Sequence, residues 1–256
     1  IPYEKNPILT QRHLPADRKY PVTSTGHAQF VEGPDGKTYA IFLAVRPYRD
    51  NYYNTGRETF VAPVEWKDGW PVVDPDHQEV QYSYKVNFKE IKHKNARPQS
   101  GNFQYTLSFE KELDPALLFL RTVDSSSYNL SKKNGLTINL KPETCMELGN
   151  PSFIGKRQQH LYCITETAID FTAKSDKEKA GLVIFQDEKH FYYLCKSVDQ
   201  GKAVVQLFKS STDNSKTMEL LTQAALTTDK LMLRITAEGE QYSFSYADTP
   251  NNWVLL

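Results

Sequence analysis

Residues 28–45 read AQFVEGPDGKTYAIFLAV. Two runs rich in apolar residues, Ala28–Glu32 and Lys37–Val45, flank the turn sequence Gly33-Pro34-Asp35-Gly36. Short runs of strand-forming residues joined by a turn of Gly, Pro and Asp are typical of a β-hairpin. We therefore expect two antiparallel strands here, connected by a tight turn.

A second hairpin is predicted further along the chain. Thr59–Trp66 and Trp70–Val73 flank the turn Lys67-Asp68-Gly69. Consecutive short hairpins are typical of the blades of a β-propeller, in which small antiparallel sheets surround a central channel. Residues 1–75 are too few for a whole propeller, since the smallest ones need about four blades. We expect the remaining blades to lie in sequence that precedes Ile1.

The hairpin pattern weakens after these strands. Residues 92–101 are rich in Lys, Asn, Pro, Ser and Gly, which is the composition of a linker. We therefore place a linker at residues 76–104.

Short apolar runs separated by turn residues resume in residues 105–256, as in a β-sandwich. Thr217–Ala225 is compatible either with a helix or with a strand edge and a loop. Trp253–Leu256 stops before the closing strand that we expect of such a sandwich. The expected strands are Leu117–Arg121, Gly135–Leu140, His160–Phe171, Ala180–Gln186, Phe191–Ser197, Ala203–Ser210, Lys230–Ala237 and Gln241–Tyr246.

The charge of the chain is balanced, because Lys plus Arg number 31 and Asp plus Glu also number 31. A nucleic-acid interface needs an excess of cations to displace counterions, and an anionic membrane surface attracts polybasic segments. We therefore expect neither nucleic acid nor a membrane as a partner.

Several motifs occur in order along the chain. Together they are similar to the later propeller blades and the C-terminal sandwich of glycoside hydrolase family 43, in its β-xylosidase-like branch. The resemblance covers most of the chain and depends on the combination, because any one motif alone is weak. The motifs are Asn6-Pro7-Ile8-Leu9, Thr25-Gly26-His27-Ala28, Gly56-Arg57-Glu58-Thr59, Trp66-Lys67-Asp68-Gly69-Trp70-Pro71, Gly155-Lys156-Arg157-Gln158-Gln159-His160 and Ala180-Gly181-Leu182-Val183.

The resemblance implies an all-β protein with the last blades of a five-bladed β-propeller (1–75), a linker (76–104) and a concanavalin A-like β-sandwich (105–256). Members of the family hydrolyse xylosidic, arabinofuranosidic or related linkages with inversion, which requires a general acid and a general base. In the family these carboxylates come from earlier blades. We therefore expect the full-length protein to be a glycosidase. This chain alone should lack the catalytic acid and base and be inactive.

Two residues match positions of the family's sugar-binding site. Arg57 matches an Arg that reaches into the sugar subsite, where a guanidinium can donate two directed hydrogen bonds. Its structural alternative is pairing with Glu58 or with a strand carbonyl. His27 matches the His at the floor of the propeller channel. For Arg46, at the end of an apolar strand, we expect a structural role within the blade.

The long loop before Gly56 contains Tyr48, Tyr52 and Tyr53. These side chains either rim the substrate pocket, as loop residues often do, or are plain exposed tyrosines. The sequence leaves both interpretations open.

No metal-binding spacing is present, and no cofactor is expected. A calcium ion in the propeller channel of the full-length protein is left open, but a direct bond from His27 is not expected because calcium prefers oxygen ligands. The expected partner is an oligosaccharide containing xylose or arabinose, and the sandwich is expected to contact the propeller. A periplasmic or extracellular location is favoured over a cytoplasmic one. The alternative function is a non-catalytic module, in which the sandwich binds carbohydrate or stabilises the propeller.

Overall fold

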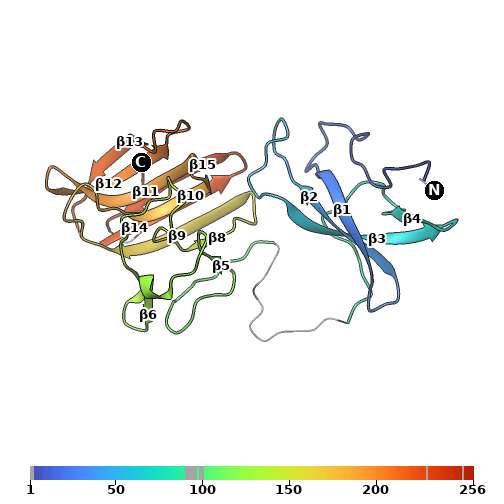
Figure 1. Ribbon diagram of the computed structural model, residues 1–256, viewed down its shortest axis with the longest axis horizontal. Coiled ribbons are helices and arrows are strands. Elements are labelled where there is room, and N and C mark those ends of the chain that lie inside the picture. Colours follow the sequence, from blue (N-terminus) through green and yellow to red (C-terminus); the bar gives the residue numbers. More distant parts are fainter. Residues whose placement is uncertain (1–2, 90–96, 98–100, 229, 250) are drawn as a thin grey trace. The chain divides into compact units, whose positions relative to one another are not determined.

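The computed structural model describes residues 3–89, 97, 101–228, 230–249 and 251–256. The chain divides into two compact units, Ile1–Tyr105 and Thr106–Leu256 (Figure 1). The described residues form β-strands and a single short 3-10 turn, Ser125–Ser127, so the prediction of an all-β protein is confirmed. No helix in the described part is long and apolar enough to cross a membrane.

The first unit contains one four-stranded antiparallel sheet in the order β1-β2-β3-β4 (Figure 1). Both predicted hairpins occur. Gly36 and Gly69 lie in their turns with φ of 72° and 80°, a conformation that glycine adopts without steric cost. The two hairpins pair through β2 and β3, so together they make one blade-like sheet. Its strands are β1 (Thr23–Glu32), β2 (Thr38–Val45), β3 (Glu58–Lys67) and β4 (Trp70–Val73).

One face of this sheet carries the core of the first unit. On β2, Ala40, Phe42 and Ala44 are at most 2% exposed, and they share a face because successive side chains of a strand point to opposite sides. Ala62 on β3 and Val73 on β4 belong to the same buried cluster.

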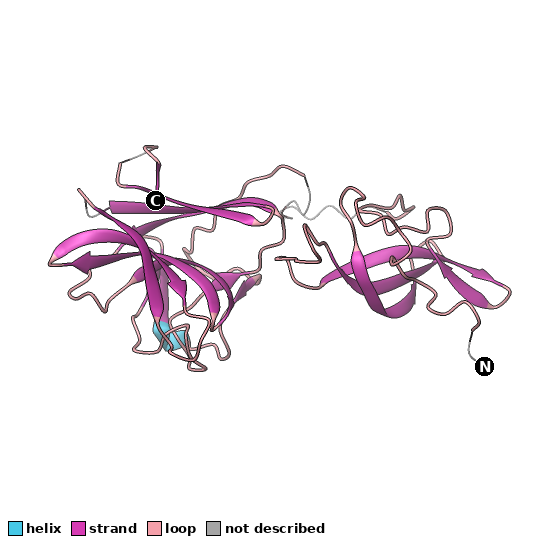
Figure 2. Cartoon of the chain, turned by 90° about the horizontal axis from the view of Figure 1, so that it is seen from above, coloured by secondary structure: helices cyan, strands magenta, loops and turns pink. Residues whose placement is uncertain are grey.

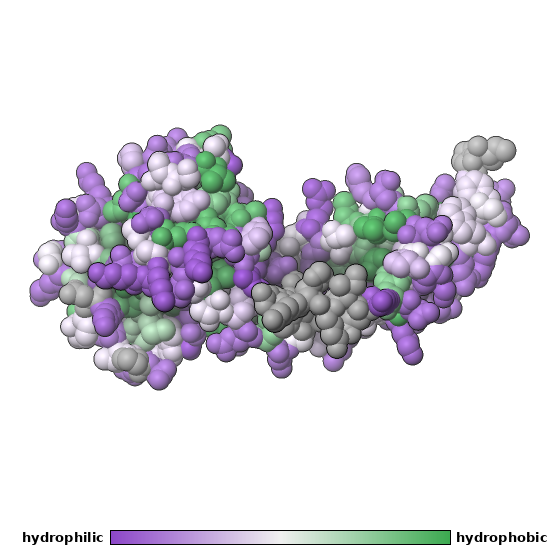
Figure 3. Space-filling view, turned by 90° about the horizontal axis from the view of Figure 1, so that it is seen from below, coloured by the Kyte–Doolittle hydropathy of each residue, from purple (hydrophilic) through white to green (hydrophobic). Residues whose placement is uncertain are grey.

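The opposite face of the same sheet is also apolar but partly uncovered. Ile41 and Val61 are cross-strand partners, and with Val31 they are 40–49% exposed. They line a hollow of about 360 Å³ that is almost entirely apolar. Figure 3 shows hydrophobic side chains reaching the surface of the first unit. A face of this kind is suited to packing against a further element.

The segment predicted as a linker is in part packed. Val80 is 4% exposed within the first unit's core, and Tyr84 packs against that core. Residues 76–89 form no strand, but Val80 and Tyr84 pack them against the first unit's core. Residues 90–96 and 98–100 of the predicted linker lie outside the described residues.

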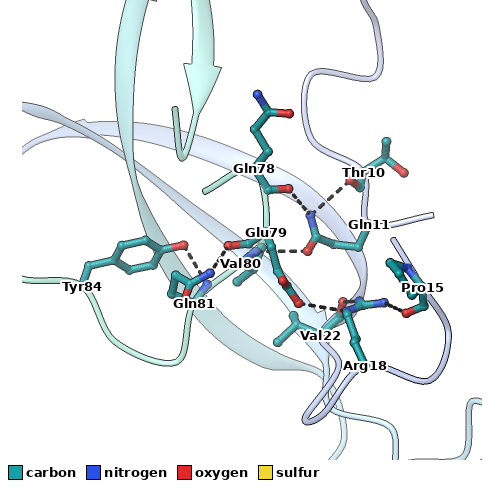
Figure 4. A network of polar contacts seen from close by, with 10 residues as sticks. All are labelled: Thr10, Gln11, Pro15, Arg18, Val22, Gln78, Glu79, Val80, Gln81 and Tyr84. Atoms are coloured by element: carbon teal, nitrogen blue, oxygen red, sulfur yellow. Dashed lines mark hydrogen bonds and ion pairs between the residues drawn. The ribbon is translucent and has the colours of Figure 1, made fainter. Parts of the chain in front are cut away.

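Polar contacts tie the chain before β1 to this packed segment (Figure 4). Gln11 is 5% exposed, and its Oε1 accepts a hydrogen bond from the backbone N–H of Val80 at 3.0 Å. Arg18 donates to the carbonyl of Val22 at 2.8 Å, and its Nε lies 3.0 Å from Glu79 Oε1. The segment before β1 and the segment after β4 therefore hold each other in place.

A buried carboxylate anchors the start of the packed segment. Asp74 is fully buried; its Oδ1 lies 2.8 Å from Nδ1 of His77, and its Oδ2 accepts from the hydroxyl of Tyr84 at 2.9 Å. The hydrogen bond to Asp74 raises the pKa of His77, and the charges of Asp74 and Asp76 act in the same direction.

This pKa shift predicts a pH-dependent stability of the first unit. A pKa that is higher in the folded state means that protonated His77 stabilises folding. The contribution is complete below about pH 6.5, the usual His value, and is lost as the pH rises through the higher folded pKa. We expect the first unit's melting temperature to fall over this range. Tryptophan fluorescence in a Trp253→Phe background measures it, because Trp66 and Trp70 then report on the first unit alone.

The control for this prediction is the exposed His13. We expect His77→Gln to flatten the pH dependence and His13→Gln to leave it unchanged. Equal pH dependence in the parent and in His77→Gln would contradict the assignment.

The second unit is a sandwich of two four-stranded antiparallel sheets, in the orders β10-β11-β12-β13 and β16-β15-β14-β9. Figure 2 shows these sheets as separate layers. Leu194, Val205, Leu231 and Leu233 are at most 1% exposed and belong to the cluster between them. The strands are β9 (Tyr162–Asp170), β10 (Ala180–Asp187), β11 (His190–Asp199), β12 (Lys202–Ser210), β13 (Met218–Ala225), β14 (Lys230–Glu238), β15 (Gln241–Ala247) and β16 (Val254–Leu255).

Thr217–Ala225 is strand rather than helix: Met218–Ala225 pairs along β12. Near the end of the chain, Val254–Leu255 pairs with β15, where the sequence predicted that Trp253–Leu256 would stop short of a closing strand. The shorter strands of this unit are β5 (Leu117–Leu118), β6 (Tyr128–Ser131), β7 (Gly135–Ile138) and β8 (Gly155–Lys156).

Candidate substrate-binding site

Both predicted site residues lie toward one end of the blade-like sheet. In the register, Thr23 at the start of β1 pairs with Val45 at the end of β2, and Ala44 pairs with Glu58 at the start of β3. The fold therefore places His27 on β1 and Arg57 just before β3, the two strands that flank β2.

His27 is presented by an irregular strand. β1 has two register shifts against β2, one between Thr23 and Gly26 and one between Gly26 and Gln29. Ser24 and His27 fall within these shifts and have φ of 55° and 54°, which is uncommon for residues other than glycine. Such β-bulges re-aim side chains and are frequent beside active sites. His27 is exposed.

A hollow of about 290 Å³ lies beside His27. Its lining comes from two of the motifs named above, which are far apart in the sequence, and from one residue of β2. The lining residues are Asn6, Pro7, Ile8, Leu9, Thr25, Gly26, His27, Ala28 and Phe42. The motifs thus form one concave surface next to the imidazole.

Arg46 and Glu58 form the best-defined polar contact of this region. Nε of Arg46 donates to Oε1 of Glu58 at 2.7 Å, and Nη2 donates to Oε2 at 2.8 Å. The two side chains are only 16% and 24% exposed. The hydrogen bond to Glu58 raises the pKa of Arg46. The expected structural role of Arg46 is confirmed.

Arg57 does not take the same partner. Its side chain is exposed, and among the residues that the structure describes it has neither a hydrogen bond nor an ion pair. The preceding Gly56 has φ of 76°. Among the described residues Arg57 does not pair with Glu58, the structural alternative that the sequence left open; both oxygens of that carboxylate accept from Arg46 instead. Arg57 is free to donate hydrogen bonds to a ligand.

Aromatic side chains surround this end of the sheet. Tyr48, Tyr52 and Tyr53 in the loop before Gly56 are 37%, 62% and 45% exposed. Tyr82 lies under the Arg46 guanidinium, 5.9 Å from ring centroid to Cζ, and Tyr20 meets it edge to face at 6.1 Å. Tyr20 and Tyr82 were not predicted from the sequence, because both lie outside the hairpins and Tyr82 falls in the predicted linker.

The described residues do not by themselves fit a calcium ion. In the ranges given above, no group of three or more His, Cys, Asp or Glu side chains is placed to hold a metal. Calcium takes six to eight oxygen ligands, and His27 offers nitrogen.

Two protein-family models match the chain. The family described as "Beta xylosidase C-terminal Concanavalin A-like domain" matches residues 107–256, and "Glycosyl hydrolases family 43" matches residues 2–71. The chain belongs to glycosyl hydrolase family 43. The first match covers the sandwich, and the second covers β1, β2, β3 and the start of β4.

Two curated relatives illustrate the relationship. The chain is 33% identical over 187 residues to "Xylosidase/arabinosidase" from Butyrivibrio fibrisolvens, which is 73% of this chain and 35% of that protein. It is 32% identical over 250 residues to "Non-reducing end alpha-L-arabinofuranosidase BoGH43B" from Bacteroides ovatus, which is 95% of this chain and 45% of that protein. The chain thus spans less than half the length of these relatives.

Solved family 43 structures share the fold. The structure titled "Bacteroides ovatus Xyloglucan PUL GH43B" superposes with a TM-score of 0.82 at 29% identity, covering 100% of this chain and 49% of that one. "Crystal structure of a GH43_12 retrieved from capybara gut metagenome" gives the same TM-score and identity, covering 99% and 47%. The predicted propeller-and-sandwich fold class is confirmed.

Proposed function

We propose that the full-length protein is a glycosidase that cleaves xylosidic or arabinofuranosidic linkages in plant-type oligosaccharides or polysaccharides. The observation that carries this proposal is the unpaired Arg57 guanidinium, at the same end of a family 43 blade as His27 and its hollow. The relatives named as xylosidase/arabinosidase and as α-L-arabinofuranosidase support the sugar class.

The chemistry we propose is inversion at the anomeric carbon. A general acid protonates the leaving oxygen while a general base activates a water on the other face, and the two carboxyl groups stand about 6.5–9.5 Å apart to admit that water. We assign neither carboxylate to this chain. Glu58, the carboxylate next to Arg57, is already paired with Arg46.

The residues of this chain bind and orient the sugar in this proposal. Arg57 donates two directed hydrogen bonds to hydroxyl groups or to a catalytic carboxylate, for which a planar guanidinium is suited. His27 presents an imidazole on the bulged part of β1 and contributes to the same subsite. Holding the sugar in a reactive geometry lowers the barrier by fixing orientation in advance.

The proposal is tested with the full-length protein and two aryl glycosides, 4-nitrophenyl β-D-xylopyranoside and 4-nitrophenyl α-L-arabinofuranoside. We expect release of 4-nitrophenol from at least one of them. Proton NMR of the first product formed should show the anomer opposite to that of the substrate. Absence of hydrolysis of both substrates and of xylo-oligosaccharides would overturn the glycosidase proposal, and a retained anomer would overturn the inverting mechanism.

A further inference from the structure

The contact between Arg46 and Glu58 bears on the neighbouring residue, Arg57. We propose that Glu58 is a positioning residue, which together with Arg46 and Thr55 forms a clamp that holds Arg57 in place and keeps its guanidinium available for the sugar. This inference rests on the proposed function, because it gives Arg57 a substrate to contact.

Glu58 already has partners within the blade. Both carboxylate oxygens accept from Arg46, at 2.7 Å and 2.8 Å, in the forked geometry that is strongest for an Arg–carboxylate pair. Oε1 also accepts from the hydroxyl of Thr55 at 2.9 Å. Without Arg46, the covalently adjacent Arg57 would be the nearest alternative cation in the sequence. By pairing with Glu58, Arg46 therefore keeps that carboxylate from competing with the sugar for the Arg57 guanidinium.

The loop before β3 is held by a hydrogen bond and a glycine turn. The hydrogen bond from Thr55 to Glu58 joins residues three apart and closes a short loop around Gly56 and Arg57. Gly56 supplies the left-handed backbone that this loop needs, with φ of 76°. Arg57 is thus held by a glycine turn on one side and by the start of β3 on the other.

Glu58 and Arg46 are both anchored on the packed sheet. Glu58 pairs in register with Ala44, which is fully buried. Arg46 follows β2 directly and lies against the ring of Tyr82 at 5.9 Å. Both halves of the ion pair are therefore anchored on adjacent strands of a packed sheet. Sites built on such elements hold their groups more closely than sites on free loops.

The test is a double-mutant cycle in the full-length protein, with kcat/KM for the aryl glycoside that is hydrolysed. The variants are Arg57→Ala, Glu58→Gln and the double substitution. We expect Glu58→Gln to lower kcat/KM by about tenfold or more, as misplacement of a binding group does. The double variant should be within about twofold of Arg57→Ala alone, because Glu58 acts through Arg57.

Each result of the cycle has a separate meaning. Unchanged kcat/KM in Arg57→Ala would remove Arg57 from the site and overturn the substrate-binding part of the proposed function. A loss in Arg57→Ala with no loss in Glu58→Gln would overturn only the positioning role. Additive losses would also overturn it, because Glu58 would then act independently of Arg57.

Two further variants separate positioning from stability. Glu65→Gln is the matched control, since Glu65 is on the same strand and exposed, 3.3 Å from Lys67; it should leave kcat/KM unchanged. Arg46→Lys keeps the positive charge but loses the paired hydrogen bonds of the guanidinium to Glu58. This variant tests the clamp if Glu58→Gln does not fold. We expect its loss to be non-additive with Arg57→Ala as well, and an additive loss would again overturn the proposal.

Discussion

Arg57→Ala in the full-length protein is expected to lower kcat/KM by about a hundredfold or more while leaving the melting temperature unchanged. A hydrogen bond that involves a charged group contributes about 1.5–3 kcal/mol, and each 1.36 kcal/mol is a factor of about ten in rate. Arg57 is exposed and has no partner among the described residues, so its removal leaves no buried group unsatisfied. The loss should therefore appear in catalysis and not in folding.

The measurement is steady-state kinetics on the aryl glycosides, together with a thermal melt. Arg12→Ala is the matched control, because Arg12 is an exposed Arg of the same unit outside the site; its kcat/KM should equal that of the parent. Arg57→Lys should recover only part of the loss, since an ammonium cannot donate the two parallel hydrogen bonds of a guanidinium. An Arg57→Ala variant as active as the parent would remove Arg57 from the site.

Gly181→Ala is expected to destabilise the sandwich by about 3 kcal/mol or more, the upper part of the range for overpacking. Gly181 lies on β10 opposite Cys195 of β11. A Cβ at Gly181 would lie 2.6 Å from the Cα of Cys195 and closer still to the carbonyl oxygen of Leu194. Both atoms belong to the backbone of a central strand, so they cannot give way as a flexible side chain can.

Thiol labelling measures this effect selectively. All three cysteines, Cys145, Cys163 and Cys195, are free and lie in the second unit, and Cys195 is fully buried. In Gly181→Ala, we expect Cys195 to react much faster and the unit's melting temperature to fall by about 10 °C.

Gly149→Ala is the matched control for this variant. A Cβ there would meet the flexible side chain of Glu143 at 3.1 Å, which can move aside. Protection of Cys195 in Gly181→Ala equal to that in the control would contradict the predicted destabilisation.

The sequence predicted the long strands well because their signal is local. Gly36 and Gly69 mark turns that only a left-handed backbone can make, and the apolar runs beside them identify the strands. The short strands β6, β8 and β16 were not predicted, since two to four residues give no period. Met218–Ala225 contains the helix formers Glu, Leu, Gln and Ala, but its pairing with β12 overrides that preference.

The candidate site was predictable only in part. The motifs identified Arg57 and His27, but they could not say which Arg pairs with Glu58. Arg57 is adjacent to it and Arg46 is twelve residues away; the antiparallel pairing of β2 with β3 decides for Arg46. Likewise Val80 and Tyr82 lie in a segment of linker-like pattern, and only tertiary packing shows that they belong to the blade.

The two bulges of β1 also affect how its sequence is to be aligned with other chains. From Thr23 to Gln29 the strand advances six residues while β2 advances four, from Val45 to Ile41. Each extra residue moves the side chains that follow it to the other face of the sheet, and the second shift restores the original faces. Deletion of one extra residue would exchange the buried and exposed faces of part of the strand. Deletion of both would preserve the sheet but abolish the outward presentation of His27. In an alignment, a chain that lacks both extra residues is therefore compatible with the same sheet, whereas a chain that lacks only one is not.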